Sequence, residues 1–366
     1  MHSISTSSPA ERGTHTWAEI SQQMNLWPTT LERVNATVNR FNLRDVFSGA
    51  RVLLTGAGTS FYAASAIAAA WSRSTAVAST DLLVDADRYL NDIDILISVG
   101  RSGDSPESMA TVDRVQKVHP GIRHFAVTCN GSGALAQSSS VQAIVLDPRT
   151  EDKSLVMTSS FTNLVIAGLA LADSPMVEEA VAGAARNAQL RFSQINEAVQ
   201  RIAAAVTNRI VLLSSSPLYP WAQEGTLKVT EMAGGKFPVL AETYLGLRHG
   251  PMTFLQPDTV VLCLLSSQAE RRNYELDLIR ELNTKSLGHI FAIGSTPEEN
   301  ELFHDRVDAV APTAPDELRT PFETIGPQLL GYHLSLLAGL NPDNPSPDGV
   351  INRVVQGVKI YSPSSL

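Results

Sequence analysis

Two residue types that move protons lie in the stretch WAQEGTLKVTEMAGGKFPVLAETYLGLRHGPMT, which runs from Trp221 to Thr253. Glu231 falls on an expected helix, and His249 falls in a loop bounded by glycine and proline. A histidine titrates near neutral pH and a positioned carboxylate can act as a base, so the pair suits general acid–base catalysis. The spacing alone also fits a solvated helix carboxylate and a loop histidine that caps a neighbouring element.

A glycine turn precedes this segment, at the end of an apolar strand. RVLLT is the apolar run, GAGTS follows it, and an Ala-rich helix is expected to begin at Thr59 or Ser60. The N–H groups and positive dipole end of such a helix attract phosphate. A dinucleotide-binding turn would carry a third glycine where this chain has Phe61. The turn therefore favours a single phosphate group over a dinucleotide, although either hydroxyl could simply cap the helix.

A second turn of the same kind follows the apolar run DIDILISV. Its sequence is GRSGDSPES, and a helix is expected from about 106 to 118. Hydroxyl and amide groups at the carboxyl ends of neighbouring parallel strands can converge on one anion. The candidate ligands in this turn are Gly100, Arg101, Ser102 and Ser105. The two turns together predict a site for a small phosphate monoester such as a sugar phosphate.

Apolar strands alternate with helices through both halves of the 366-residue chain. This order predicts α/β architecture with parallel sheets covered on both faces, and the two halves repeat the same strand, Ser-rich turn and helix. The Ala-rich stretch Val177–Ala205 is expected to bridge the halves. We divide the chain into an N-terminal helical arm, two α/β domains and a C-terminal tail over the site, at 1–32, 33–180, 200–345 and 346–366.

Composition argues against several classes of function. A formal net charge of −9 disfavours a large nucleic-acid-binding surface. No run approaches the roughly 20 apolar residues of a membrane span. Cys129 and Cys263 lie outside any metal-ligand spacing and suit a reducing compartment. We therefore expect a cytoplasmic protein that binds neither nucleic acid nor membrane and needs no metal or redox cofactor.

The motifs together resemble the tandem sugar isomerase (SIS) family. GAGTS, GRSGDSPES and the segment from Glu231 to Pro251 are similar to the isomerase half of glucosamine-6-phosphate synthase. The combination of LRHGP, GLNPDNPSP and INRVVQGVKIY more closely resembles the galactosamine-6-phosphate deaminase/isomerase branch. The resemblance implies two tandem SIS domains, each a flavodoxin-like three-layer α/β/α sandwich with a mainly parallel sheet. It also implies a homodimer with its active sites between the two domains.

The resemblance assigns roles to individual residues. Glu231 takes the place of the catalytic glutamate, and His249 that of the ring-opening histidine, which the family takes from the partner chain. Arg248, beside it, could hold an anion or pair with a carboxylate. The residues implied around the substrate phosphate are Ser60, Ser102 and Ser105, with Gly100 and Arg101 in the same turn and Thr59 and Ser160 as neighbours.

One position departs from the synthase. Gln356 stands where the synthase has a lysine that forms an imine with the ketose, and Lys359 is out of register. The resemblance therefore implies conversion of galactosamine 6-phosphate to tagatose 6-phosphate and ammonia. The alternatives are an aldose–ketose isomerase without deamination, a glucosamine-6-phosphate deaminase and a non-catalytic phosphosugar sensor. The preferred C4 epimer stays open, because the two sugars differ in one hydroxyl orientation that a few side chains could read.

Overall fold

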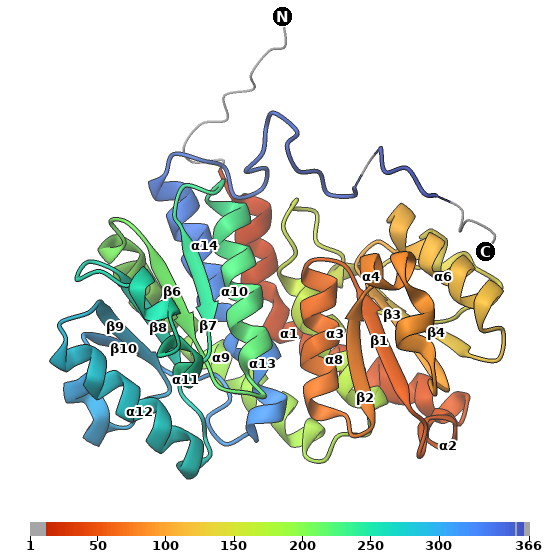
Figure 1. The fold of residues 1–366 in the computed structure, drawn as a ribbon, viewed down its shortest axis with the longest axis horizontal. Helices are drawn as coiled ribbons and strands as arrows, with labels where there is room; N and C mark the ends of the chain where they lie inside the picture. Colours follow the sequence, from red (N-terminus) through yellow and green to blue (C-terminus); the bar gives the residue numbers. More distant parts are fainter. Residues whose placement is uncertain (1–11, 356, 362–366) are drawn as a thin grey trace, which may run out of the picture.

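The computed structural model describes residues 12–355 and 357–361 of the chain. Two five-stranded sheets lie on opposite sides of the molecule, and helices fill the space between them (Figure 1). The strand order is β2-β1-β3-β4-β5 in the first sheet and β10-β9-β8-β6-β7 in the second, which is the same order read from the other edge. The strands of each sheet pair in parallel, for example β1 with β3 and β6 with β8. The predicted pair of flavodoxin-like domains is confirmed.

The first sheet is built from residues 52–145. Its strands are β1 (Val52–Gly56), β2 (Ser74–Ala78), β3 (Ile95–Gly100), β4 (Arg123–Thr128) and β5 (Gln142–Val145). The helices of this half are α1 (Thr14–Arg40), α2 (Leu43–Phe47), α3 (Thr59–Ala70), α4 (Ser79–Val84), α5 (Ala86–Leu90), α6 (Pro106–Val118), α7 (Ala134–Gln137) and α8 (Ser159–Leu171).

The second half repeats this plan after one long helix, α9 (Val177–Ala205), which coincides with the predicted bridge. Its strands are β6 (Ile210–Leu213), β7 (Val239–Glu242), β8 (Val260–Leu264), β9 (His289–Ile293) and β10 (Asp305–Val307). Its further helices are α10 (Tyr219–Met232), α11 (Tyr244–Leu247), α12 (Ala269–Thr284), α13 (Asp316–Glu323) and α14 (Ile325–Leu337). Short 3-10 helices cover Pro148–Thr150, Pro251–Phe254 and Pro297–Leu302.

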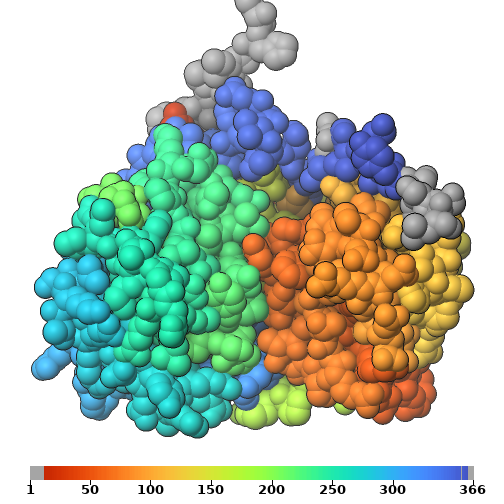
Figure 2. Space-filling view, in the orientation of Figure 1, coloured from red at the N-terminus to blue at the C-terminus, as the bar shows by residue number. Residues whose placement is uncertain are grey.

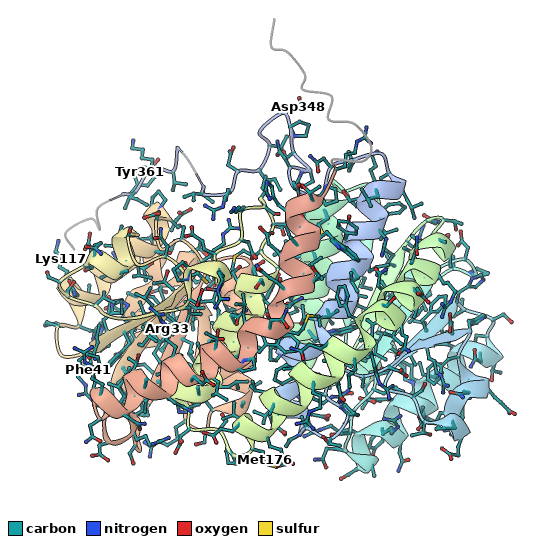
Figure 3. The ribbon with its side chains drawn as sticks, turned by 180° about the vertical axis from the view of Figure 1, so that it is seen from behind. Arg33, Phe41, Lys117, Met176, Asp348 and Tyr361 are labelled. Carbon is teal, nitrogen blue, oxygen red and sulfur yellow. The ribbon has the colours of Figure 1, made fainter. Side chains whose placement is uncertain are left out.

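A shared layer of helices joins the two halves. Helices α1, α3 and α8 pack in this layer against α9, α10, α13 and α14, and one hydrophobic core runs through it from sheet to sheet. Figure 3 shows α1 and α9 crossing the back of the layer. The buried face of α1 includes Ile20, Met24 and Trp27, and the helix continues through Pro28 to Arg40. None of the described helices is long and apolar enough to cross a membrane.

The C-terminal tail leaves α14 and crosses from the second half to the first. It follows the upper edge of the molecule (Figure 1) and covers the top of the boundary between the halves in the space-filling view (Figure 2). Asp343 anchors its start, because the carboxylate accepts a 2.7 Å hydrogen bond from the N–H of Thr16, and the backbone carbonyl accepts one of 3.1 Å from Leu155. Asp348 and Tyr361 mark the course of the tail along this edge (Figure 3).

Candidate active site

The start of helix α3 meets one face of helix α10 between the two halves. Thr59 is the first residue of α3, and its Oγ1 accepts a hydrogen bond of 3.0 Å from the ammonium of Lys228. The same ammonium donates to Oε2 of Glu231 at 2.8 Å and lies 3.3 Å from Oε1 of Glu224. The three α10 residues follow an i, i+4, i+7 spacing, which places them on one side of the helix. Lys228 therefore links Glu231 directly to the first glycine turn.

Lys228 and Glu224 are fully buried, so their charges depend on one another. Burial alone would lower the pKa of Lys228, but the carboxylates of Glu224 and Glu231 raise it overall, and the amine keeps its proton. Burial raises the pKa of Glu224 to about 8, Lys228 opposes that rise, and Glu231 adds to it. Glu224 is therefore mostly protonated near neutral pH. Its carboxyl oxygens make no directed hydrogen bond among the described residues, despite the short distance to the ammonium.

Glu231 is the acidic member of this cluster that reaches the surface. Its side chain is 24% exposed, whereas the side chain of Glu224 is not exposed at all. Lys228 holds Oε2 of Glu231, which fixes the orientation of the carboxylate. A carboxylate that is fixed on one side and open on the other can take a proton from a bound ligand and return it.

The turn between β1 and α3 needs its two glycines for different reasons, lack of space at Gly56 and a positive φ at Gly58. A Cβ on Gly56 would lie 2.6 Å from the backbone carbonyl of Ser60, and Gly58 has a φ of 55°. This close approach draws Thr59 and Ser60 to the end of β1, where both are buried. The Oγ of Ser60 has a weak contact of 4.0 Å with the sulfur of Met157, so the hydroxyl can readily exchange that contact for a ligand.

The second turn connects β3, which ends at Gly100, to α6. The hydroxyl of Ser102 accepts a 3.2 Å hydrogen bond from the N–H of Asp104, and that of Ser105 donates to Glu107 at 2.7 Å. Because β1 and β3 are neighbours and the strand order reverses between them, the two turns lie at the same edge of the sheet. The predicted phosphate-binding residues Ser60, Ser102 and Ser105 are thus brought to one edge.

Two predicted neighbours of the ligand direct their side chains into the protein. The guanidinium of Arg101 donates to the backbone carbonyls of Ser154, Leu155 and Arg353. Ser160 is fully buried, and its hydroxyl donates to Asp152. Asp152 also accepts hydrogen bonds from backbone N–H groups at the start of α8. Both predicted residues therefore hold the scaffold beside the turns.

His249 lies in the loop after α11, exposed to solvent. Its neighbour Arg248 donates to Glu281 at 2.7 Å and to Asp277 at 2.8 Å, which ties this loop to α12 on the outer side of the second sheet. The structure shows no hydrogen bond from the ring of His249 to any described residue. Of the two alternatives for Arg248, pairing with carboxylates is the one observed.

Gln356 lies outside the described residues. Sequence reasoning missed Glu224 and Lys228, whose spacing from Glu231 was the available signal. It also missed Asp152 and Arg353, which carried no motif. Within the described residues there is no group of three or more histidine, cysteine, aspartate or glutamate side chains that could hold a metal ion.

Comparison with known proteins finds relatives over nearly the whole chain. The D-galactosamine-6-phosphate deaminase AgaS of Shewanella sp. (strain ANA-3) is 34% identical over 363 residues, which cover 94% of this chain and 90% of that protein. The protein of the same name from Escherichia coli O157:H7 is 32% identical over 379 residues, with 96% and 97% covered. No family model matches the chain.

A solved structure of similar size supports the same grouping. The tagatose-6-phosphate ketose/aldose isomerase from Escherichia coli superimposes with a TM-score of 0.86 at 28% identity, covering 99% of this chain and all (100%) of that one. Fold, chain length and sequence therefore agree across these relatives.

Proposed function

Because the chain belongs to the tandem sugar isomerase (SIS) family, in the branch of the galactosamine-6-phosphate deaminases, we propose that it converts galactosamine 6-phosphate to tagatose 6-phosphate and ammonia. The observation that carries the proposal is the contact of Thr59 with Lys228 and of Lys228 with Glu231. It connects a turn suited to phosphate with a carboxylate suited to proton transfer, across the boundary between the two domains.

The phosphate binds first, at the two turns that follow β1 and β3. Ser60, Ser102 and Ser105 supply hydroxyl donors, and the start of α3 supplies its N–H groups and positive dipole end. An anchored phosphate holds C1 and C2 of the sugar near Glu231, so that the reaction does not depend on collision. The hydroxyl of Ser105 would exchange its present bond to Glu107 for the phosphate.

The reaction then needs three proton movements. His249 opens the ring by moving a proton between the anomeric hydroxyl and the ring oxygen, which gives the free amino aldehyde. Glu231 removes the proton on C2 and returns it to C1, while a proton of the amino group passes to O1, which converts the amino aldehyde into a ketose imine at C2 with a hydroxyl on C1. Water adds to this imine and ammonia leaves, so C2 becomes the ketone carbon of tagatose 6-phosphate.

Lys228 and Glu224 support this chemistry from the buried side of Glu231. The ammonium of Lys228 donates to Oε2 of Glu231 at 2.8 Å and so holds the carboxylate of the proposed base in place. The glutamine at position 356 offers no amine for an imine with the ketose, so water completes the reaction. The active assembly is a homodimer in which His249 of each chain serves the partner's site. The exposed position of His249 and its separate anchoring to α12 through Arg248 support this arrangement.

The test is an assay of both products. Purified protein and galactosamine 6-phosphate should yield ammonium and ketose phosphate in equal amounts. Glu231→Gln should lower turnover by about a hundredfold or more while binding of the reduced, ring-open substrate persists. Near-normal turnover in that variant would contradict the assignment of the base. Mixing Glu231→Gln with His249→Ala chains should restore part of the activity, and no recovery would exclude a shared site.

A plain aldose–ketose isomerase is the second candidate, because the Escherichia coli structure that superimposes on this chain bears that name. It would use the same Glu231 proton transfer and omit hydrolysis. Ketose formation from a hydroxy-aldose phosphate, with no ammonium from the amino sugar, would establish it. Turnover of neither substrate would indicate a phosphosugar sensor.

A further inference from the structure

The second turn and the C-terminal tail are joined by a buried arginine. Arg101 is 5% exposed, although it follows the β3 strand directly into the phosphate turn. Its guanidinium donates to the carbonyls of Ser154 and Leu155 at 3.1 Å each, and to the carbonyl of Arg353 in the tail at 2.8 Å. The side chain therefore donates hydrogen bonds to three backbone carbonyls, which belong to two other segments of the chain.

Arg353 makes the return contact from the tail. Its Nε donates to the backbone carbonyl of Asp152 at 3.1 Å, and its Nη2 pairs with the carboxylate of Glu151 at 3.0 Å. The segment that receives these bonds is itself fixed, because Glu19 of α1 accepts from the N–H of Lys153 at 2.6 Å. Arg353 thus holds the tail against a fixed part of the first domain, beyond the anchor that Asp343 provides at its start.

We propose that Arg101 and Arg353 are positioning residues that latch the tail over the active site and link it to the phosphate turn. The backbone carbonyl of Arg101 accepts from the N–H of Cys129 and the hydroxyl of Thr128, so the turn is anchored on one side to β4. Its neighbours Gly100 and Ser102 belong to the turn that we propose binds the phosphate. A shift of this turn on phosphate binding moves the Arg101 guanidinium, and with it the tail carbonyl that the guanidinium holds.

The latch gives the tail a defined role in the reaction. Beyond Arg353 the described tail carries exposed apolar side chains, including Val355, Val358 and Ile360. A tail held at Arg353 can place such side chains against a bound sugar and exclude water from the proton-transfer steps. This inference rests on the proposed function for the identity of the sugar, but the link between phosphate and tail does not require turnover.

The test measures hydrogen exchange of the tail amides, 341–361, with and without the reduced substrate 2-amino-2-deoxygalactitol 6-phosphate. The ligand should slow exchange in the parent protein and in the control Lys359→Ala, whose ammonium contacts Tyr361 in the same tail. Arg353→Ala should exchange fast in both conditions and bind the ligand within about threefold of the parent. Its kcat should fall by about tenfold to a hundredfold, since closure and not phosphate binding is lost. Arg353→Lys should recover part of the protection, through one hydrogen bond.

Three results would overturn the inference. In the first, the ligand protects the tail of Arg353→Ala as much as it protects the tail of the parent. In the second, the ligand binds to the parent without protecting its tail. In the third, Arg353→Ala loses ligand affinity by the same factor as it loses turnover. Tail protection in a protein that releases no ammonium would instead reject the proposed deamination and leave the latch standing.

Discussion

Replacement of Lys228 by methionine isolates the energetic role of the buried ammonium. Methionine keeps an unbranched apolar stem and removes the hydrogen bonds to Thr59 and Glu231. The pKa of Glu224 is about 8, so this carboxyl is mostly protonated at pH 7. The variant therefore does not leave Glu224 as a buried charge without a partner. The variant then loses the charge-assisted hydrogen bond to Glu231 and leaves the hydroxyl of Thr59 without the donor that Lys228 provides. Together these should lower the free energy of unfolding by about 2–4 kcal/mol.

The cost of this substitution should increase with pH. Without the ammonium, the pKa of Glu224 rises above its value of about 8 in the parent, because Lys228 is what opposes the effect of burial. Between the two pKa values the folded variant holds one proton that the folded parent has released. The stability gap between parent and variant therefore widens above pH 8, by at most about 1.4 kcal/mol per pH unit.

Urea denaturation at pH 7.0, 8.0, 8.5 and 9.0 measures this gap. Glu224→Gln is the matched control, because glutamine imitates the protonated acid and should cost less than about 1 kcal/mol at pH 7. In the double variant Glu224→Gln/Lys228→Met the widening above pH 8 should disappear. A gap that stays constant with pH in the single variant, or that widens equally in the double variant, would refute the coupling of these two side chains.

Three further predictions concern other groups. Burial, and then the charge of Asp152, raise the pKa of Glu19 from 4.5 to about 7, so its stabilising protonated form is lost as pH rises through 7. Relative to the parent, Glu19→Gln should gain about 2–3 kcal/mol of unfolding free energy between pH 5 and pH 8, and a flat difference by denaturation would contradict this. Arg248→Ala should release the His249 loop from α12 and lower kcat about threefold to tenfold, with little change in melting temperature; unchanged kinetics would exclude a role in positioning. Burial raises the pKa of the Cys129 thiol to about 12 and also raises that of Cys263, so iodoacetamide at pH 8 should label neither thiol before unfolding, as read by mass spectrometry.

The central elements of the fold could be predicted because their patterns are complete within a few residues. The α6 helix spans Pro106–Val118 as predicted, with proline in its first turn, and β1 and β8 are buried along their whole length. The edge strands β2 and β10 went unpredicted. Their sequences, STAVA and DRV, are short and partly exposed, so they lack the apolar run that marks a central strand.

The last helical stretch is divided into two helices, α13 and α14, which meet at Thr324. Pro327 has no N–H to donate to the carbonyl of Glu323, four residues earlier. That carbonyl instead accepts a 3.0 Å hydrogen bond from the indole N–H of Trp221. The break therefore depends on a partner about a hundred positions away in the chain, which no local pattern contains.

Site residues that belong to a sequence motif could be predicted, whereas site residues that are marked only by their burial could not. Gly56 and Gly58 identified the first turn, and the position of Glu231 on a helix identified a candidate base. Lys228 was missed because lysine is rarely buried, so its i, i+4, i+7 spacing reads as an ordinary charged helix face. The burial of this helix face is apparent only in the folded protein, where α3 of the other half packs against it.

The second half repeats the fold without repeating the predicted phosphate turn. Ser266 and Ser267 follow β8, which is the counterpart of β3 in the strand order. Here the carboxylate of Asp316 accepts from the hydroxyl of Ser266, and from the N–H and hydroxyl of Ser267 at 2.8 and 2.9 Å. Arg271 and Arg319 also donate to it, at 3.0 and 3.1 Å. An internal carboxylate thus takes the hydroxyl and N–H donors of this turn. Under the proposed function the phosphate binds at the turns of the first half, and the second half presents Glu231.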